Sequence, residues 1–140
     1  MTYLDTSVLV AYYCPEVLSD KAEDAIIKSA TPLISQLVEV ELQSAVARKI
    51  REKALVKGDG VEILTRFRLH LDSGCYSRLP IESSHYDIAA RWISRFDVPL
   101  RTLDALHLAV CFDADALLLT ADAGLAKAAR HFRVNVQLLG

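Results

Sequence analysis

The sequence predicts an α/β fold in which a parallel β-sheet of about five strands is flanked by helices on both faces. Hydrophobic residues make up 52% of the chain, and Gly and Pro are scarce, which excludes a disordered or fibrous protein. Short apolar runs alternate with longer helical patterns, and connections this short favour right-handed crossovers. No linker or repeat divides residues 1–140, so we expect a single domain.

Five apolar runs are brief enough to be buried strands, although periodicity alone does not separate such runs from buried helix. They are residues 2–4, 32–34, 76–80, 116–120 and 135–139. Helical patterns lie between them, several preceded by Ser, Thr or Asp as N-caps. A short helix follows the first strand, and the longer helices are expected at 19–29, 36–54, 61–71, 84–96, 103–113 and 123–131.

The segment from 36 to 71 carries two helices that the alternating pattern does not require, and we interpret it as an insertion. Gly58, Asp59 and Gly60 are expected to form the turn between these helices. In doubly wound sheets of this kind, ligands bind beyond the carboxyl ends of the strands, where the winding changes direction. That edge is where functional side chains are expected.

The charge content of the sequence bears on whether the protein binds nucleic acid. The 16 Lys and Arg against 18 Asp and Glu give a net charge of −2, so whole-molecule charge does not predict nucleic-acid binding. A local basic run is the best phosphate-contacting candidate, although a solvated helix face explains it equally well. This run comprises Arg48, Lys49, Arg51, Lys53 and Lys57.

Three cysteines, Cys14, Cys75 and Cys111, lie among apolar neighbours. Their odd number and spacing predict reduced core thiols instead of a disulfide framework or a metal knuckle. No apolar stretch approaches the length of a membrane span, and the N-terminus lacks the pattern of a signal peptide. We therefore expect a cytoplasmic protein with no membrane contact.

Two aspartates follow predicted strands where helices begin. Asp5 comes directly after residues 2–4, and Asp122 lies two residues beyond 116–120. Either residue alone is explained by helix capping. Two caps have no reason to converge, whereas a cation needs several oxygen ligands from one place. The pair therefore predicts a carboxylate site.

Two more acids belong to helices that lead to the same edge. Asp104 is in the first turn of an apolar helix, where the helix dipole favours an acid without any function, but a buried acid must be paired, neutralised or metal-bound. Glu41 falls at the edge of the apolar stripe of its helix, and Glu39 falls beyond the opposite edge. A solvated face is the ordinary place for a helical Glu, and Glu39 stays a competitor.

Asp5, Glu41, Asp104 and Asp122 supply the hard oxygen ligands that Mg²⁺ or Mn²⁺ prefers, and no paired Cys or His has zinc spacing. Such ions support phosphodiester cleavage, because they activate water and neutralise phosphate. Three hydroxyl residues next to the acids are expected to orient water or to form hydrogen bonds around the site, although each alone is also explained by a structural role. They are Thr6, Ser7 and Thr120.

The four histidines form no cluster in the sequence. His107 lies one helical turn after Asp104, where two interpretations stay open: it faces the same cleft as the acids, or, as we expect, it is a core or sheet-facing histidine that is hydrogen-bonded to the backbone. The other three, His70, His85 and His131, are expected at the surface.

Four segments, in order and with suitable spacing, together resemble the PIN-domain family, and in particular its VapC-type toxins. They are Tyr-Leu-Asp-Thr-Ser at 3–7, Glu41 after the second strand, Leu-Asp-Ala-Leu-His-Leu-Ala at 103–109 and Leu-Leu-Leu-Thr-Ala-Asp at 117–122. The resemblance covers almost the whole chain. The last two segments are its most specific parts.

The resemblance implies that Asp5, Glu41, Asp104 and Asp122 gather Mg²⁺ or Mn²⁺ for RNA cleavage. It also implies a homodimer and a cognate VapB-like antitoxin whose C-terminal segment occupies the groove near the acids. The chain departs from the family pattern after Asp122, because many relatives carry another polar or acidic residue where this chain has Ala123 and Gly124. That departure leaves a second metal position open.

Three other functions compete with a toxin nuclease. A housekeeping RNA-processing nuclease of the same family is one. A phosphoryl-transfer enzyme or receiver domain is another, but it is disfavoured because Ser7 stands where a phosphatase of that kind has a second Asp. A non-catalytic interaction module, in which the acids only cap helices, is the third.

Overall fold

The computed structural model describes all 140 residues and contains one sheet of five strands. The strands are β1 (Thr2–Leu4), β2 (Pro32–Ile34), β3 (Ser77–Arg78), β4 (Leu117–Thr120) and β5 (Val136–Leu138). All four pairings are parallel, and the spatial order is β3-β2-β1-β4-β5. The predicted α/β class with a five-stranded parallel sheet is confirmed.

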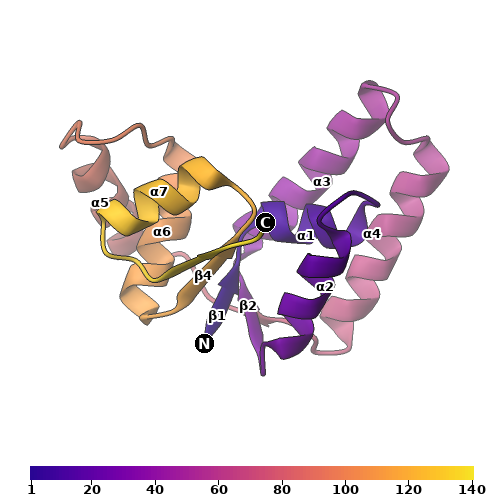
Figure 1. Ribbon diagram of the computed structural model, residues 1–140, viewed down its shortest axis with the longest axis horizontal. Coiled ribbons are helices and arrows are strands. Elements are labelled where there is room, and N and C mark those ends of the chain that lie inside the picture. Colours follow the sequence, from indigo (N-terminus) through magenta and orange to yellow (C-terminus); the bar gives the residue numbers. More distant parts are fainter.

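Seven helices surround the sheet: α1 (Thr6–Tyr13), α2 (Ser19–Lys28), α3 (Gln36–Arg51), α4 (Lys57–Asp72), α5 (Ser83–Ile93), α6 (Thr102–Ala114) and α7 (Ala123–His131). In Figure 1, α1 to α4 lie on one side of the central strands and α5 to α7 on the other. The chain runs outward from β1 to β3 and then returns to β4 on the other side of β1. The winding therefore reverses between β1 and β4, which is where such sheets bind ligands.

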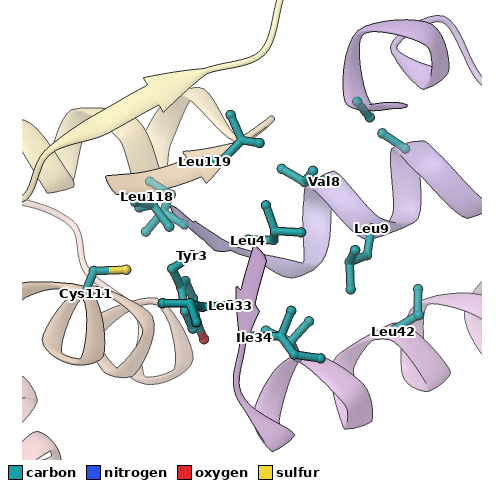
Figure 2. Packing of buried hydrophobic residues seen from close by; sticks show 14 of the residues in the cluster. Tyr3, Leu4, Val8, Leu9, Leu33, Ile34, Leu42, Cys111, Leu118 and Leu119 are labelled. Atoms are coloured by element: carbon teal, nitrogen blue, oxygen red, sulfur yellow. The ribbon is translucent and has the colours of Figure 1, made fainter. Parts of the chain in front are cut away.

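The central strands are buried on both faces. Along β1, Tyr3 points toward α6 and Cys111, whereas Leu4 points toward α1 and packs near Val8 and Leu9 (Figure 2). Tyr3 and Leu4 are both fully buried. This two-sided burial explains why the strand sequence is continuously apolar instead of alternating.

The helical hairpin departs from the prediction. Gly58, Asp59 and Gly60 do not form a turn, because α4 already begins at Lys57 and the turn occupies residues 52–56. Gly60 allows α4 to approach α3, since a Cβ there would lie 2.6 Å from the Ile50 side chain. The glycines were interpreted as part of a turn between the two helices, whereas Gly60 lies within α4 and allows it to pack closely against α3.

Several smaller predictions were also wrong. The third strand is limited to Ser77–Arg78 and forms the edge of the sheet, instead of extending over 76–80. Cys14 and Cys111 are buried as expected, but Cys75 is exposed just after α4.

No helix is both long and apolar enough to cross a membrane.

Candidate active site

Asp5 connects β1 to α1 and is almost fully buried, with 4% of its surface exposed. Its Oδ1 accepts hydrogen bonds from the Ser7 hydroxyl and the Val8 amide, so the capping interpretation also holds. Its Oδ2 accepts a hydrogen bond of 2.7 Å from the Thr120 hydroxyl. Both carboxylate oxygens are therefore held in place.

The two hydroxyls that orient Asp5 are themselves fixed by the end of β4. The Ala121 amide donates to Ser7 Oγ at 2.8 Å, and the Asp122 amide donates to Thr120 Oγ1 at 3.0 Å. This network joins the carboxyl ends of β1 and β4. Ser7 and Thr120 thus act on the site by donating to Asp5.

Glu41 reaches the site from α3. Its Oε1 accepts a hydrogen bond of 2.8 Å from the Thr6 hydroxyl and another from His107 Nε2. Glu39 lies elsewhere, because both of its carboxylate oxygens bind the Arg78 guanidinium at 2.7 and 2.9 Å. Glu41, and not Glu39, is therefore bonded to Thr6, the neighbour of Asp5, and to His107 on the helix of Asp104.

His107 is buried as expected, but its partners are side chains and not the backbone. Its Nδ1 lies 2.7 Å from the Tyr3 hydroxyl, which is also 2.8 Å from Ser35 Oγ. Because an ionised carboxylate only accepts hydrogen bonds, we assign a proton to His107 Nε2, which donates to Glu41. A buried chain from Ser35 through Tyr3 and His107 therefore holds Glu41.

The sequence did not predict these buried hydrogen bonds among Ser35, Tyr3 and His107. Their signal was the strand residue Tyr3, a polar side chain in a continuously apolar strand, which needs a buried partner. Its hydroxyl is fully enclosed, and burial raises the Tyr3 pKa well above its ordinary value. The group therefore stays protonated and available as a hydrogen-bond donor.

Asp104 and Asp122 form the more open half of the site. Asp104 is in the first turn of α6, and its Oδ2 pairs with the exposed Arg101 guanidinium at 3.3 Å. Asp122 caps α7, and its Oδ1 accepts from the Gly124 and Leu125 amides. Both acids line a pocket of about 400 Å³.

The electrostatics differ among the acids. Burial raises the pKa of Asp5, although the hydrogen bonds from Ser7 and Thr120 oppose the rise. Burial also acts to raise the pKa of Glu41, but His107 and Thr6 outweigh it and leave that pKa below its ordinary value.

The third acid, Asp104, has a pKa raised by burial, with Arg101 opposing the rise and the charge of Asp122 adding to it. The charges of Asp104 and Asp122 thus repel each other. A cation placed between them would relieve that repulsion.

No three Asp, Glu, His or Cys side chains stand close enough together to enclose a metal ion. The donor set nevertheless fits a hydrated divalent cation. Glu41, Asp104 and Asp122 each use one carboxylate oxygen in hydrogen bonds, which leaves the other oxygen available. Mg²⁺ keeps several of its waters and takes only one or two carboxylates directly, so it does not require a closed cage.

A family model described as PIN domain matches residues 2–131 of the chain. The chain belongs to the PIN domain family. No curated protein sequence matches it.

Several solved structures share the fold of this PIN domain. VapC20 of Mycobacterium tuberculosis, described as a sarcin–ricin loop cleaving toxin, is 17% identical over 91% of this chain and 95% of that one, with a TM-score of 0.73. VapBC2 of Rickettsia felis, bound to a promoter DNA fragment, is 16% identical over 100% of both chains, with a TM-score of 0.72. A toxin–antitoxin complex from Klebsiella pneumoniae is 16% identical over 90% of this chain and 91% of that chain, with a TM-score of 0.66.

The remaining histidines of the PIN domain lie outside the four-acid site. His131 is exposed as expected, and His70 is half-buried and bonded to the Tyr13 hydroxyl. His85 was expected at the surface but is buried, because it forms a capping box with Glu82 at the start of α5 and also binds Asp113. The capping role fixes its place in the fold.

Proposed function

We propose that this PIN domain is a Mg²⁺- or Mn²⁺-dependent endoribonuclease. One observation carries the proposal: hydrogen bonds and one shared pocket link four acids from four separate segments near the reversal of the sheet winding, and three of these acids keep an oxygen free of hydrogen bonds. The four are Asp5, Glu41, Asp104 and Asp122. Helix capping explains the positions of Asp5 and Asp122, but it does not explain why Glu41 is bonded to Thr6, next to Asp5, and to His107 on the helix of Asp104.

The roles of the side chains follow from their surroundings. A bound divalent ion would supply water activation at neutral pH and charge neutralisation on the phosphate. Asp5 is fixed by Ser7 and Thr120 at both oxygens, so it would anchor the ion with little reorganisation. Glu41 is kept ionised by His107 and Thr6, which suits a group that binds a cation or accepts a proton from water.

We further propose that the protein is the toxin of a VapBC-type pair, acting in the cytoplasm and held inactive by a VapB-like antitoxin. The fold shared with VapC20 and with a toxin–antitoxin complex supports this role. A homodimer is supported by a groove of about 470 Å³ bordered by exposed apolar side chains. Val40, Tyr86 and Leu103 contribute from α3, α5 and α6.

The first experiment is cleavage of total cellular RNA by the purified protein with Mg²⁺ or Mn²⁺. EDTA and the Asp5→Asn variant serve as negative arms, and Asp24→Asn on the exposed face of α2 is the matched control. Discrete fragments that require both the metal and Asp5 are expected. If the folded, antitoxin-free protein leaves every RNA class intact, the nuclease is refuted and the interaction module is favoured.

The same fragments separate the toxin from a housekeeping nuclease. A toxin is expected to cut a small number of sites, to arrest growth when expressed alone and to be silenced by a co-expressed antitoxin. Maturation of a precursor RNA without growth arrest would instead identify a processing enzyme.

A further inference from the structure

The pocket beside Asp104 and Asp122 is formed by the loop that precedes α6 and by the first turns of α7. Its volume of about 400 Å³ falls within the usual range for small-ligand sites. Because two of the proposed catalytic acids are part of its wall, whatever occupies the pocket lies directly beside these acids.

The lining has an apolar part and a charged part. Val98, Leu100, Leu125 and Ala128 form the apolar wall. The cations Arg101 and Lys127 are both exposed, and the side chain of Arg101 is 84% exposed. Three acids, Asp97, Asp104 and Asp122, also line the pocket. An apolar wall for a base, acids beside it and two exposed cations within reach of a phosphate match a nucleotide.

Asp97 provides a hydrogen-bond acceptor at the wall of the pocket. Its Oδ2 accepts from Arg95 Nε at 3.0 Å and from His131 Nε2 at 3.2 Å, so the carboxylate is held at the wall of the pocket. Its Oδ1 accepts no hydrogen bond within the protein. A carboxylate oxygen of this kind accepts from an exocyclic amino group, which cytosine, adenine and guanine carry and uracil lacks.

We propose that this pocket binds the nucleoside next to the scissile phosphate and selects an amino-bearing base over uracil. The base packs against the apolar wall, Asp97 accepts from its amino group, and Arg101 and Lys127 face its phosphate. This inference rests on the proposed nuclease function. Arg101 is free to take this role, because its present contact with Asp104 is a single 3.3 Å interaction.

A nucleotide titration tests the pocket without any cleavage. CMP, AMP, GMP and UMP are added separately to isotope-labelled protein in EDTA, and backbone amide shifts are followed by NMR. CMP, AMP or GMP is expected to shift resonances of residues 97–101 and 124–128 at lower concentration than UMP. Shifts confined to other regions, equal shifts with UMP, or no shifts at all would overturn the proposal.

Base preference provides the second test. A randomised RNA is cleaved with Mg²⁺ or Mn²⁺, and the bases flanking each cut are sequenced. The wild-type protein is expected to disfavour uracil at one flanking position by about tenfold, the size of one good base contact. Val98→Trp, which fills the pocket, and Asp97→Asn, which replaces the acceptor, are each expected to remove this preference.

The controls separate the possible failures. Val17→Trp introduces the same ring at a fully exposed position and is expected to keep the preference. If the wild type cleaves RNA but folded Val98→Trp and Asp97→Asn retain its preference, the pocket proposal falls while the nuclease stands. If the wild type cleaves no RNA, the nuclease fails, and the nucleotide titration alone judges the pocket.

A peptide occupant is an outcome of the same variants. Loss of antitoxin binding in Val98→Trp with an unchanged base preference would show that the pocket holds a segment of a protein. That result would overturn nucleoside binding there.

Discussion

The two halves of the candidate site are built differently. Asp5 and Glu41 are held by four side chains, Ser7, Thr120, Thr6 and His107, in a network that excludes water from most of Asp5. Asp104 and Asp122 have only a weak ion pair and α7 amides as partners, and they border an open pocket. The difference separates a preorganised half from an adaptable half.

Preorganisation and adaptability suit different tasks. A carboxylate that is already oriented binds a cation without reorganising, and its hydrogen-bond partners tune its charge. A carboxylate beside a pocket is free to adjust when the substrate enters. We therefore expect the first half to govern metal binding and stability, and the second half to govern contact with RNA.

The largest expected effect is the loss of cleavage in Asp5→Asn or Asp104→Asn. Each change removes one charge with little change of shape, so activity is expected to fall by about a thousandfold or more. Calorimetric titration of Mn²⁺ sharpens the comparison, because Asp5→Asn is expected to weaken metal binding more than Asp104→Asn. Equal weakening would contradict a division of labour between the halves.

Both variants are expected to fold, which circular dichroism and thermal melting check. Unfolding of both would support structural acids instead of ligands. Asp24→Asn on α2 controls for the loss of one aspartate charge and is expected to retain full activity.

A smaller effect is expected from His107→Phe, which removes the support of Glu41 and leaves the Tyr3 hydroxyl with Ser35 as its partner. Loss of such a supporting residue lowers metal affinity or activity by about 10- to 100-fold. The two lost hydrogen bonds are expected to cost about 1–3 kcal/mol in the free energy of unfolding. Urea denaturation measures the stability, and cleavage with varied Mn²⁺ tests whether added metal restores activity.

The adaptable half provides the comparison for that result. Arg101→Ala removes an exposed ion pair, so its effect on stability is expected to stay within about 0.5 kcal/mol. A large destabilisation by Arg101→Ala, or none by His107→Phe, would erase the distinction between the halves.

The sequence pattern indicated where the aspartates lie in the fold, but it did not predict the side-chain network of the preorganised half. Asp5 and Asp122 were found because a strand end followed by a helix start is a local pattern. Glu41 was not separated from Glu39 by the helix pattern alone, since the choice depends on Arg78 and His107, which are distant in the sequence. Long-range side-chain pairing is what the local pattern does not encode.

The fold shows the same limit. Strands near the centre, such as β1 and β2, were predicted to the residue because burial on both faces imposes a continuous apolar run. The edge strand Ser77–Arg78 is exposed and short, so its ends carry no apolar signal. Gly60 was misassigned because its role depends on a contact with Ile50 in another helix.

The pH dependence of stability is expected to have opposite signs at two acids of the preorganised half. Glu41 has a lowered folded pKa, so its contribution is present above the ordinary Glu pKa and is lost as pH falls through the folded pKa. Glu41→Gln is therefore expected to be most destabilising near neutral pH and nearly neutral in strong acid. Urea denaturation in EDTA across this pH range measures the trend.

Asp5 is expected to behave in the opposite way. Its folded pKa is raised mainly by burial, so the ionised group lowers stability near neutral pH, and this penalty is relieved as pH falls through the raised pKa. The stability of Asp5→Asn relative to the wild type is thus expected to be highest near neutral pH and to decline with acidification. Parallel pH trends in the Asp5 and Glu41 variants would show that hydrogen bonding, and not burial, dominates at Asp5.

The smallest effect concerns the basic run on the helix of Glu41. Arg48 lies two helical turns beyond Glu41, on the same face of α3 and about 10 Å further along it, and both Arg48 and Arg51 are exposed. If RNA follows this face, the double variant Arg48→Ala/Arg51→Ala is expected to bind single-stranded RNA about 3- to 10-fold more weakly. Its slope of log affinity against log salt is expected to flatten by about 1.4, because two phosphate contacts are lost. The matched double variant Lys21→Ala/Arg91→Ala removes the same charge from α2 and α5 and serves as the control. An equal loss of affinity in this control would mean that α3 contributes only to the overall electrostatic field of the protein. RNA would then be positioned from the side of Arg101 and Lys127.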